Sequence, residues 1–334
     1  MYKKFFNLKE NPFNVNPDPR YLFLTRNTQE ALACLTYGIE TRKGFILLTG
    51  EVGTGKTTLL NKLLGWLHQE NVATAFVFNP RLSVSQFFDF MMADFGIPCE
   101  SRMKSQVLLK LNQWLLERYQ AGERAVLIVD EAQNLSPQML EEIRLLTNLE
   151  TSTEKLLQIV LSGQPELEIK LNQPQLRQLR QRITLRAKTL PLTLEETRGY
   201  INERLRIAGN DGAEIFSPEA IEAVHHYARG IARVTNVLGE HALISSFVDQ
   251  RKPVPREVVE EVARDFDLHE IDPLAQAVPP PAALANSPAN GAANGHQAPL
   301  VESLLQALNA LVERLNNAEI TVEPEKEGQT EKKS

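Results

Sequence analysis

The sequence has few cysteines and no long hydrophobic run. Its 334 residues include only Cys34 and Cys99, and neither lies at a spacing typical of a metal site. No stretch approaches eighteen uninterrupted apolar residues, and the lysines near the N-terminus are not followed by the apolar core of a signal peptide. These absences argue against a disulfide framework, an integral membrane span and secretion, so we expect a cytoplasmic protein.

Most of the chain also lacks a strong excess of either acidic or basic residues. The sequence holds 42 acidic and 36 basic residues, and nine of the acidic but only four of the basic ones fall within residues 269–334. The part of the chain before that segment is therefore almost neutral, which neither demands nor excludes nucleic acid as a partner.

A glycine-rich loop is the most specific feature of the sequence. Residues 50–58 lie between an apolar run suited to a buried strand (45–49) and a segment with leucines at helical spacing (56–70). This context is typical of a phosphate-binding P-loop, or Walker A motif, in which backbone N–H groups and a helix N-terminus face the phosphates. The predicted nucleotide contacts are Gly50, Glu51, Val52, Gly53, Thr54, Gly55, Lys56, Thr57 and Thr58.

Two carboxylates at the end of another strand pattern agree with this loop. Lys56 is predicted to reach the β- and γ-phosphates of ATP, and Thr57 to bind Mg²⁺. Residues 125–131 form an apolar run that ends in Asp130 and Glu131, as a Walker B element requires. We expect Asp130 to hold the magnesium ion through its water shell and Glu131 to polarise the attacking water, which favours hydrolysis over binding alone.

Strand and helix patterns alternate as far as Leu190, and only helix patterns follow. The alternation predicts an α/β fold with a mostly parallel sheet covered by helices on both faces, and the remainder predicts an all-helical lid domain. The further predicted strands are 72–79, 156–162 and 184–190, and the predicted helices are 83–95, 105–120, 136–149, 195–208, 217–229, 232–248 and 255–267.

A P-loop domain followed by a helical lid is the AAA+ arrangement, which directs attention to polar side chains beyond the Walker motifs. Ser162 and Gln164 lie at the tip of a predicted strand, where a sensor of the γ-phosphate is expected. Gln164 resembles a catalytic amide that orients water, although a loop glutamine with its own hydrogen bonds would give the same pattern. Arg233, at the start of a lid helix, is predicted to fold over the nucleotide as a second sensor.

Three arginines precede the last predicted strand. Arg177, Arg180 and Arg182 form either a solvated helix face or the source of an arginine finger that reaches the γ-phosphate of a neighbouring subunit. We select Arg182 as the finger.

The C-terminal segment differs in composition from the rest of the chain. Residues 269–299 are rich in Pro, Ala, Asn and Gly, which is typical of a flexible linker. Leucines at three- and four-residue intervals in residues 300–318 predict an amphipathic helix that binds a protein partner, with an intermittently helical tail as the alternative. Residues 319–334 are charged and expected to be disordered.

Several motifs together resemble the ExeA-type AAA+ ATPases, a family associated with general secretion pathway protein A. The resemblance implies ATP and Mg²⁺ as ligands, an AAA+ domain over residues 1–192 whose N-terminal segment (1–30) lies near the adenine, and a lid domain over 193–268. It also implies a homo-oligomer, in which subunits form rings or arcs with nucleotide between them. The motifs are residues 5–13, 17–24, 43–57, 130–135, 162–167 and 179–183, within a resemblance that spans about residues 1–267.

The chain departs from secretion-pathway members of this family, which continue into a membrane span and a peptidoglycan-binding module. We therefore do not expect a role in cell-wall remodelling. We expect an ATPase that drives or gates assembly of a secretion, pilus or surface-polysaccharide export system, either free in the cytoplasm or held at the inner membrane by a partner. The alternatives are a regulator that binds double-stranded DNA, like transposition target selectors, and a nucleotide-gated scaffold, which the presence of Glu131 disfavours.

Overall fold

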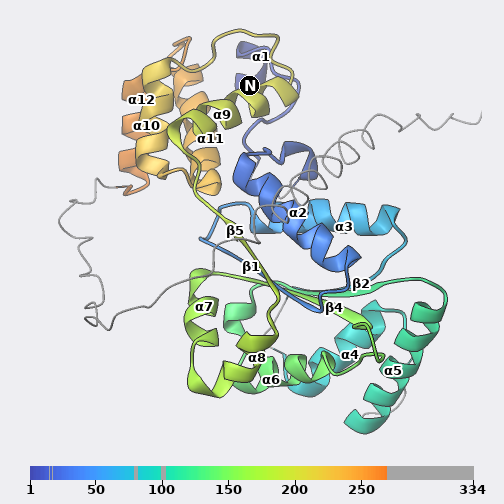
Figure 1. Ribbon diagram of the computed structural model, residues 1–334. Helices are drawn as coiled ribbons and strands as arrows, with labels where there is room; N and C mark the ends of the chain where they lie inside the picture. The colour runs from blue at the N-terminus through green and yellow to red at the C-terminus, as the bar shows by residue number, and fades with distance from the viewer. Residues whose placement is uncertain (15, 17, 79–81, 99–102, 269–334) are drawn as a thin grey trace, which may run out of the picture. The chain divides into compact units, whose positions relative to one another are not determined.

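The structure, a computed structural model, describes residues 1–14, 16, 18–78, 82–98 and 103–268. A five-stranded parallel sheet carries helices on both faces, and a group of helices follows it in the chain (Figure 1), which confirms the predicted fold class. The strands are β1 (Phe45–Gly50), β2 (Ala73–Val77), β3 (Ala125–Val129), β4 (Leu157–Gly163) and β5 (Leu185–Thr189), in the spatial order β2-β3-β4-β1-β5.

The three central strands are almost wholly apolar because helices cover both of their faces. Every residue of β1, β3 and β4 is buried. In the register of the sheet, Leu48 lies beside Ser162, and Gly50 lies beside Thr189 on the other neighbour of β1. Because parallel strands end at the same edge of a sheet, the P-loop, the two Walker B carboxylates and the loop after β4 come together there.

Side chains at alternate positions along each strand point to opposite faces of the sheet. Within the described residues, one face packs against the apolar sides of two helices and the other against those of five. Figure 1 shows these helices on either side of the sheet. The first face carries α2 (Arg26–Glu40) and α3 (Lys56–Gln69), and the second carries α4 (Val84–Asp94), α5 (Lys104–Gln120), α6 (Pro137–Leu146), α7 (Pro165–Leu171) and α8 (Arg177–Arg182).

Several helices begin where capping patterns in the sequence indicate. The Ser83 hydroxyl accepts the Gln86 N–H in a capping box, and the Ser136 hydroxyl accepts the Met139 N–H before a proline at the first helical position. The predicted helices of this domain differ from the observed ones by at most three residues at an end. Helices α2, α7 and α8 were not predicted from the sequence.

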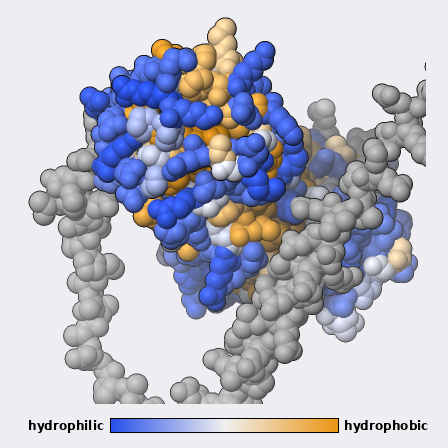
Figure 2. Space-filling view, turned by 90° about the horizontal axis from the view of Figure 1, so that it is seen from above, coloured by the Kyte–Doolittle hydropathy of each residue, from blue (hydrophilic) through white to orange (hydrophobic). Residues whose placement is uncertain are grey.

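In the described part of the chain, the lid consists of four helices whose apolar sides face one another. They share one cluster of buried side chains, separate from the cluster under the second face of the sheet. Seen from above, the lid surface is mainly hydrophilic (Figure 2), as expected for helices that bury their apolar sides. The lid helices, all predicted to within two residues, are α9 (Leu194–Ile207), α10 (Pro218–Ala228), α11 (Ala232–Val248) and α12 (Arg256–Asp265), and a short helix, α1 (Tyr2–Phe5), packs against α11.

The N-terminal segment as far as Phe13 packs with the lid and not with the sheet. Phe6 and Phe13 are at most 1% exposed and belong to the lid cluster. The side-chain amide of Asn11 donates to the Glu240 carboxylate of α11 at 3.0 Å. The lid helices bury these aromatic rings. The expected grouping of residues 1–30 with the nucleotide-binding domain stays a prediction. The predicted boundary after residue 192 stays a prediction.

The predicted linker (269–299), amphipathic helix (300–318) and charged tail (319–334) lie outside the described residues. In the part of the chain that is described, no helix has the length and apolar character needed to cross a bilayer.

Candidate nucleotide-binding site

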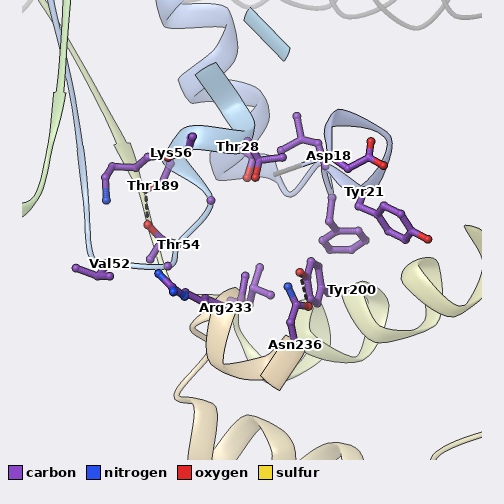
Figure 3. Close-up of a pocket in the computed structure, with 18 of the residues that line it drawn as sticks. Asp18, Tyr21, Thr28, Val52, Thr54, Lys56, Thr189, Tyr200, Arg233 and Asn236 are labelled. Carbon is purple, nitrogen blue, oxygen red and sulfur yellow. Dashed lines mark hydrogen bonds between the residues drawn. The ribbon is translucent and has the colours of Figure 1, made fainter. Parts of the chain in front are cut away.

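A pocket of about 410 Å³ lies where the P-loop, the N-terminal segment and the lid meet. Figure 3 shows Thr54 and Lys56 at one end of it and Tyr21 and Tyr200 at the other. The predicted site residues that line the pocket are Val52, Gly53, Thr54, Gly55, Lys56, Thr57, Thr58, Glu131, Gln164 and Arg233. Four others, Gly50, Glu51, Asp130 and Arg182, are not among the lining residues.

The loop backbone has the conformation that a phosphate cradle requires. Gly53 and Gly55 have φ angles of 81° and 95°, in the left-handed region that favours glycine. Gly55 is the N-cap of α3, and a Cβ atom there would meet nothing within 4 Å, so open space lies directly above the helix N-terminus. A phosphate group fits this space because unpaired N–H groups and the helix dipole both favour an anion.

Lys56 is held close to this space. It is 7% exposed, and its Nζ donates to the carbonyl oxygens of Gly50 at 2.7 Å and Glu51 at 2.9 Å. Burial lowers the pKa of Lys56, although the nearby carboxylates of Glu131 and Asp130 act in the opposite direction. Gly50 and Glu51, which the sequence predicted as nucleotide contacts, therefore position the lysine through their main chain.

Thr57 and Asp130 supply oxygen atoms suited to a magnesium ion. The Thr57 hydroxyl donates to Oδ2 of Asp130 at 3.3 Å, and the aspartate is 5% exposed. Mg²⁺ prefers hard oxygen ligands and is commonly held by one or two protein groups together with substrate phosphates and water, so this pair fits the ion. When bound, Mg²⁺ would neutralise charge on the β- and γ-phosphates.

Two glutamine amides hold the Glu131 carboxylate. Oε2 of Glu131 accepts a hydrogen bond from Nε2 of Gln164 at 3.2 Å and another from Nε2 of Gln133. Oε1 of Gln133 in turn accepts the backbone N–H of Gln164 at 3.2 Å, so the three side chains form one network. Gln133 was not predicted from the sequence as a site residue, although its position two residues after the Walker B glutamate was an available signal.

The structure separates the two candidates for the first sensor. Gln164 lines the pocket and contacts Glu131. Ser162 is fully buried, and its hydroxyl has no hydrogen-bond partner within the described residues. This placement favours Gln164, whose sensor role stays a prediction.

The lid meets the P-loop through Arg233. Its backbone N–H donates to the Gly53 carbonyl at 3.1 Å, and its side chain lies beside Val52 and Thr54 (Figure 3). The loop is held from the sheet side as well, because the hydroxyls of Thr54 and Thr189 lie 2.7 Å apart. Arg233 is therefore placed where a lid residue could contact bound phosphates.

Arg182 lies away from this pocket, on the last turn of α8. Its Nη1 donates to Oδ1 of Asn148 at 2.6 Å and also to the hydroxyl of Thr147. Arg180 instead donates to Oδ1 of Asn172 at 2.9 Å. Neither arginine lines the pocket of its own chain. The predicted role of Arg182 as a finger therefore requires a neighbouring subunit, and it stays a prediction.

The end of the pocket opposite the P-loop is formed partly by the N-terminal segment, which was expected to lie near the adenine, and partly by lid residues that the sequence did not identify. The Tyr200 hydroxyl donates to Oδ1 of Asn236 at 2.8 Å, as Figure 3 shows, and it accepts from Nη1 of Arg204 at the same distance. Tyr21 from the N-terminal segment completes this wall. Burial raises the pKa of the Tyr200 hydroxyl, which therefore remains protonated near neutral pH.

Comparison with known proteins agrees with this geometry. Residues 39–171 match the family model described as an AAA domain. The chain is 45% identical over 248 residues to general secretion pathway protein A of Aeromonas hydrophila, an alignment that covers 74% of this chain and 45% of that protein. The chain thus spans less than half the length of this relative.

Solved structures show the same fold at low sequence identity. The ORC2 protein of Aeropyrum pernix, in complexes with ADPNP and ADP, is 16% identical with a TM-score of 0.59, over 77% of this chain and 72% of that one. Drosophila ORC bound to DNA is 18% identical with a TM-score of 0.57, over 77% of this chain and 64% of that one. The predicted resemblance to general secretion pathway protein A is confirmed, and the chain carries an AAA domain of the P-loop ATPase class.

Proposed function

We propose that this pocket binds ATP with Mg²⁺ and that Glu131 is the base for its hydrolysis. The observation that carries the proposal is the presence of the Glu131 carboxylate in the same pocket as Lys56 and the P-loop, under the amide of Gln164. In this arrangement Lys56 binds the terminal phosphates, and an oxygen of Glu131 takes a proton from the attacking water. Gln164 holds the carboxylate and the water in position.

We further propose that hydrolysis drives or gates assembly of a secretion, pilus or surface-polysaccharide export system. The similarity to general secretion pathway protein A supports this role. The protein would work in the cytoplasm or at the inner membrane through a partner, and subunits would assemble so that Arg182 of one faces the pocket of the next. Residues 300–318 would supply the contact with that partner.

The alternative is an ATPase that binds double-stranded DNA. The fold is shared with Drosophila ORC bound to DNA, but so low a sequence identity carries only the fold. Contacts to DNA phosphates release counterions, so a DNA-dependent activity would weaken steeply with salt.

Phosphate release by the purified chain distinguishes these functions. We expect phosphate release that requires Mg²⁺ and stops when EDTA is added. Addition of double-stranded DNA should leave the rate of release unchanged at both low and high salt. Stimulation by DNA that disappears as salt rises would instead support the DNA-binding function.

A truncation tests the role of the C-terminal segment. Removal of residues 269–334 should leave phosphate release nearly unchanged, because all lining residues of the pocket precede them, and it should abolish assembly of the export system in cells. Loss of basal hydrolysis would make this segment part of the motor.

A further inference from the structure

One arginine in the wall of the pocket has an unusual set of partners. Arg204 of α9 is 5% exposed, and its guanidinium donates to three oxygen atoms. Nε donates to the Pro12 carbonyl at 2.5 Å, Nη2 to the Asn14 carbonyl at 2.9 Å and Nη1 to the Tyr200 hydroxyl at 2.8 Å. Two of these bonds join the lid to the main chain of the N-terminal segment, although the two lie far apart in the sequence.

The same guanidinium packs against aromatic rings from both sides of that junction. Its Cζ lies 4.4 Å from the ring centre of Tyr21 and 5.3 Å from that of Tyr200. Cation–π contacts of this kind are worth most when they are shielded from water. Both tyrosines line the pocket, so the position of Arg204 sets the position of its wall.

We propose that Arg204 is a positioning residue for nucleotide binding. It fastens the N-terminal segment to the lid and so shapes the end of the pocket that receives the nucleoside. The inference rests on the proposed function, in which the P-loop binds the phosphates. Since the phosphates occupy the end beside Lys56, the base and ribose extend toward Tyr21 and Tyr200 (Figure 3).

The chemistry of the side chain makes the proposal specific to arginine. A planar guanidinium presents donors in a fixed fork and can bond two carbonyl oxygens while it stacks on a ring, whereas a lysine ammonium cannot do both. Within the described residues Arg204 forms no salt bridge, and its hydrogen-bond partners are uncharged oxygen atoms. Arg204→Lys therefore keeps the positive charge but loses the planar, forked arrangement of hydrogen-bond donors.

Two ligands separate an effect on the nucleoside end from a general loss of structure. ATP occupies both ends of the pocket, whereas inorganic tripolyphosphate can use only the P-loop end. Dissociation constants for each are measured with Mg²⁺ on the full chain, for the parent protein, for Arg204→Lys and for Arg206→Lys. Arg206 is the matched control, since it lies on the same helix, is largely exposed and, among the described residues, pairs with its neighbour Glu203.

For Arg204→Lys we expect the ATP dissociation constant to rise about tenfold, which corresponds to about 1.4 kcal/mol of binding free energy, because the wall of the nucleoside end loses its fixed position. Tripolyphosphate binding should stay at the parent value, and KM for ATP should rise more than kcat falls. Arg206→Lys should match the parent protein with both ligands.

Unchanged ATP binding by a folded Arg204→Lys protein would overturn the proposal, as would equal weakening of both ligands. If that variant does not fold, Tyr21→Leu removes the stacked ring from the other side, and the same comparison of ligands decides. Failure of the proposed function is distinguishable, because the parent protein would then bind neither ligand and Lys56→Ala would change nothing.

Discussion

The backbone N–H of Arg233 donates to the carbonyl oxygen of Gly53 at 3.1 Å. Arg233 lies in the first turn of the lid helix α11 and Gly53 lies in the P-loop, so the two parts of the site are joined by main chain at the phosphate end of the pocket. A ligand that orders the loop would therefore also fix the lid. Closure of the lid and phosphate binding are expected to be coupled for this reason.

The tight contact at Gly53 gives the first prediction. Gly53→Ala should lower ATP affinity about ten- to a hundredfold, because its φ of 81° is strained for a side chain and the new Cβ would lie 2.8 Å from Cβ of Arg233. The measurement is equilibrium binding of ATP. In the control, Gly65→Ala, the Cβ meets nothing within 4 Å, so binding should not change and the exposed helix should be about 0.5 to 1 kcal/mol more stable. Equal affinities for the two variants would contradict this account of the loop.

The amide of Gln133 gives the second prediction. Gln133→Ala removes one of the two amides that hold the Glu131 carboxylate. Misplacement of a catalytic group by about 1 Å costs about a hundredfold in rate, so the carboxylate should become a much poorer base for the attacking water. We expect kcat to fall about ten- to a hundredfold with little change in KM.

Steady-state kinetics of Gln133→Ala beside Gln138→Ala check this expectation. Gln138 is an exposed residue of α6 and serves as the control. A change confined to KM, or none at all, would show that Gln133 does not position the base.

The fold and the phosphate end of the site could be predicted because their signals are local. The glycines, Lys56 and the two Walker B carboxylates lie in short motifs whose strand and helix context is visible in the sequence. Their meeting at one edge of the sheet follows from the parallel strand order. Helix α2 was missed although its start has a local signal, a Thr25 hydroxyl that accepts the Thr28 N–H.

At the nucleoside end only the N-terminal segment was expected, from the family resemblance, and the lid residues could not be predicted because their placement depends on contacts between distant segments. In the sequence, Arg204 cannot be distinguished from the other charged residues of an amphipathic helix. Its burial follows from bonds to Pro12 and Asn14, some 190 positions away, and no local pattern reports them. The same holds for Phe13, whose ring fills a space that only the folded lid provides.

Burial of Lys56 gives a prediction for pH dependence. Desolvation lowers the pKa of Lys56 below that of an ordinary lysine, so the ammonium loses its proton at a lower pH as the solution becomes alkaline. Phosphate binding needs the charged form, and ATP affinity should therefore begin to fall below the pH at which an exposed lysine deprotonates.

Binding of ATP measured in steps between neutral pH and about pH 10 tests this expectation. Lys56→Arg should flatten the profile, since a guanidinium stays charged throughout, even if its affinity is lower. Affinity of the parent protein that is constant over the range would show that the lysine charge is not limiting.

Assembly gives a further prediction through Arg182. If this residue acts on a neighbouring pocket, Arg182→Ala subunits mixed with Glu131→Gln subunits should regain part of the ATPase activity, because some interfaces then combine an intact finger with an intact base. Phosphate release is followed across mixing ratios, with co-assembly checked by size. No recovery in co-assembled mixtures would point to Arg177, Arg180 or another residue as the finger.

The most direct test of the central claim compares ATP binding and phosphate release in Glu131→Gln and Lys56→Ala. If the pocket is the catalytic site, Glu131→Gln should bind ATP as the parent protein does but lose at least a hundredfold in turnover, the lower bound of what a general base contributes at about 10²–10⁴. Lys56→Ala should lose binding itself. Hydrolysis at the parent rate by the Glu131→Gln protein would contradict the assignment of this carboxylate as the base.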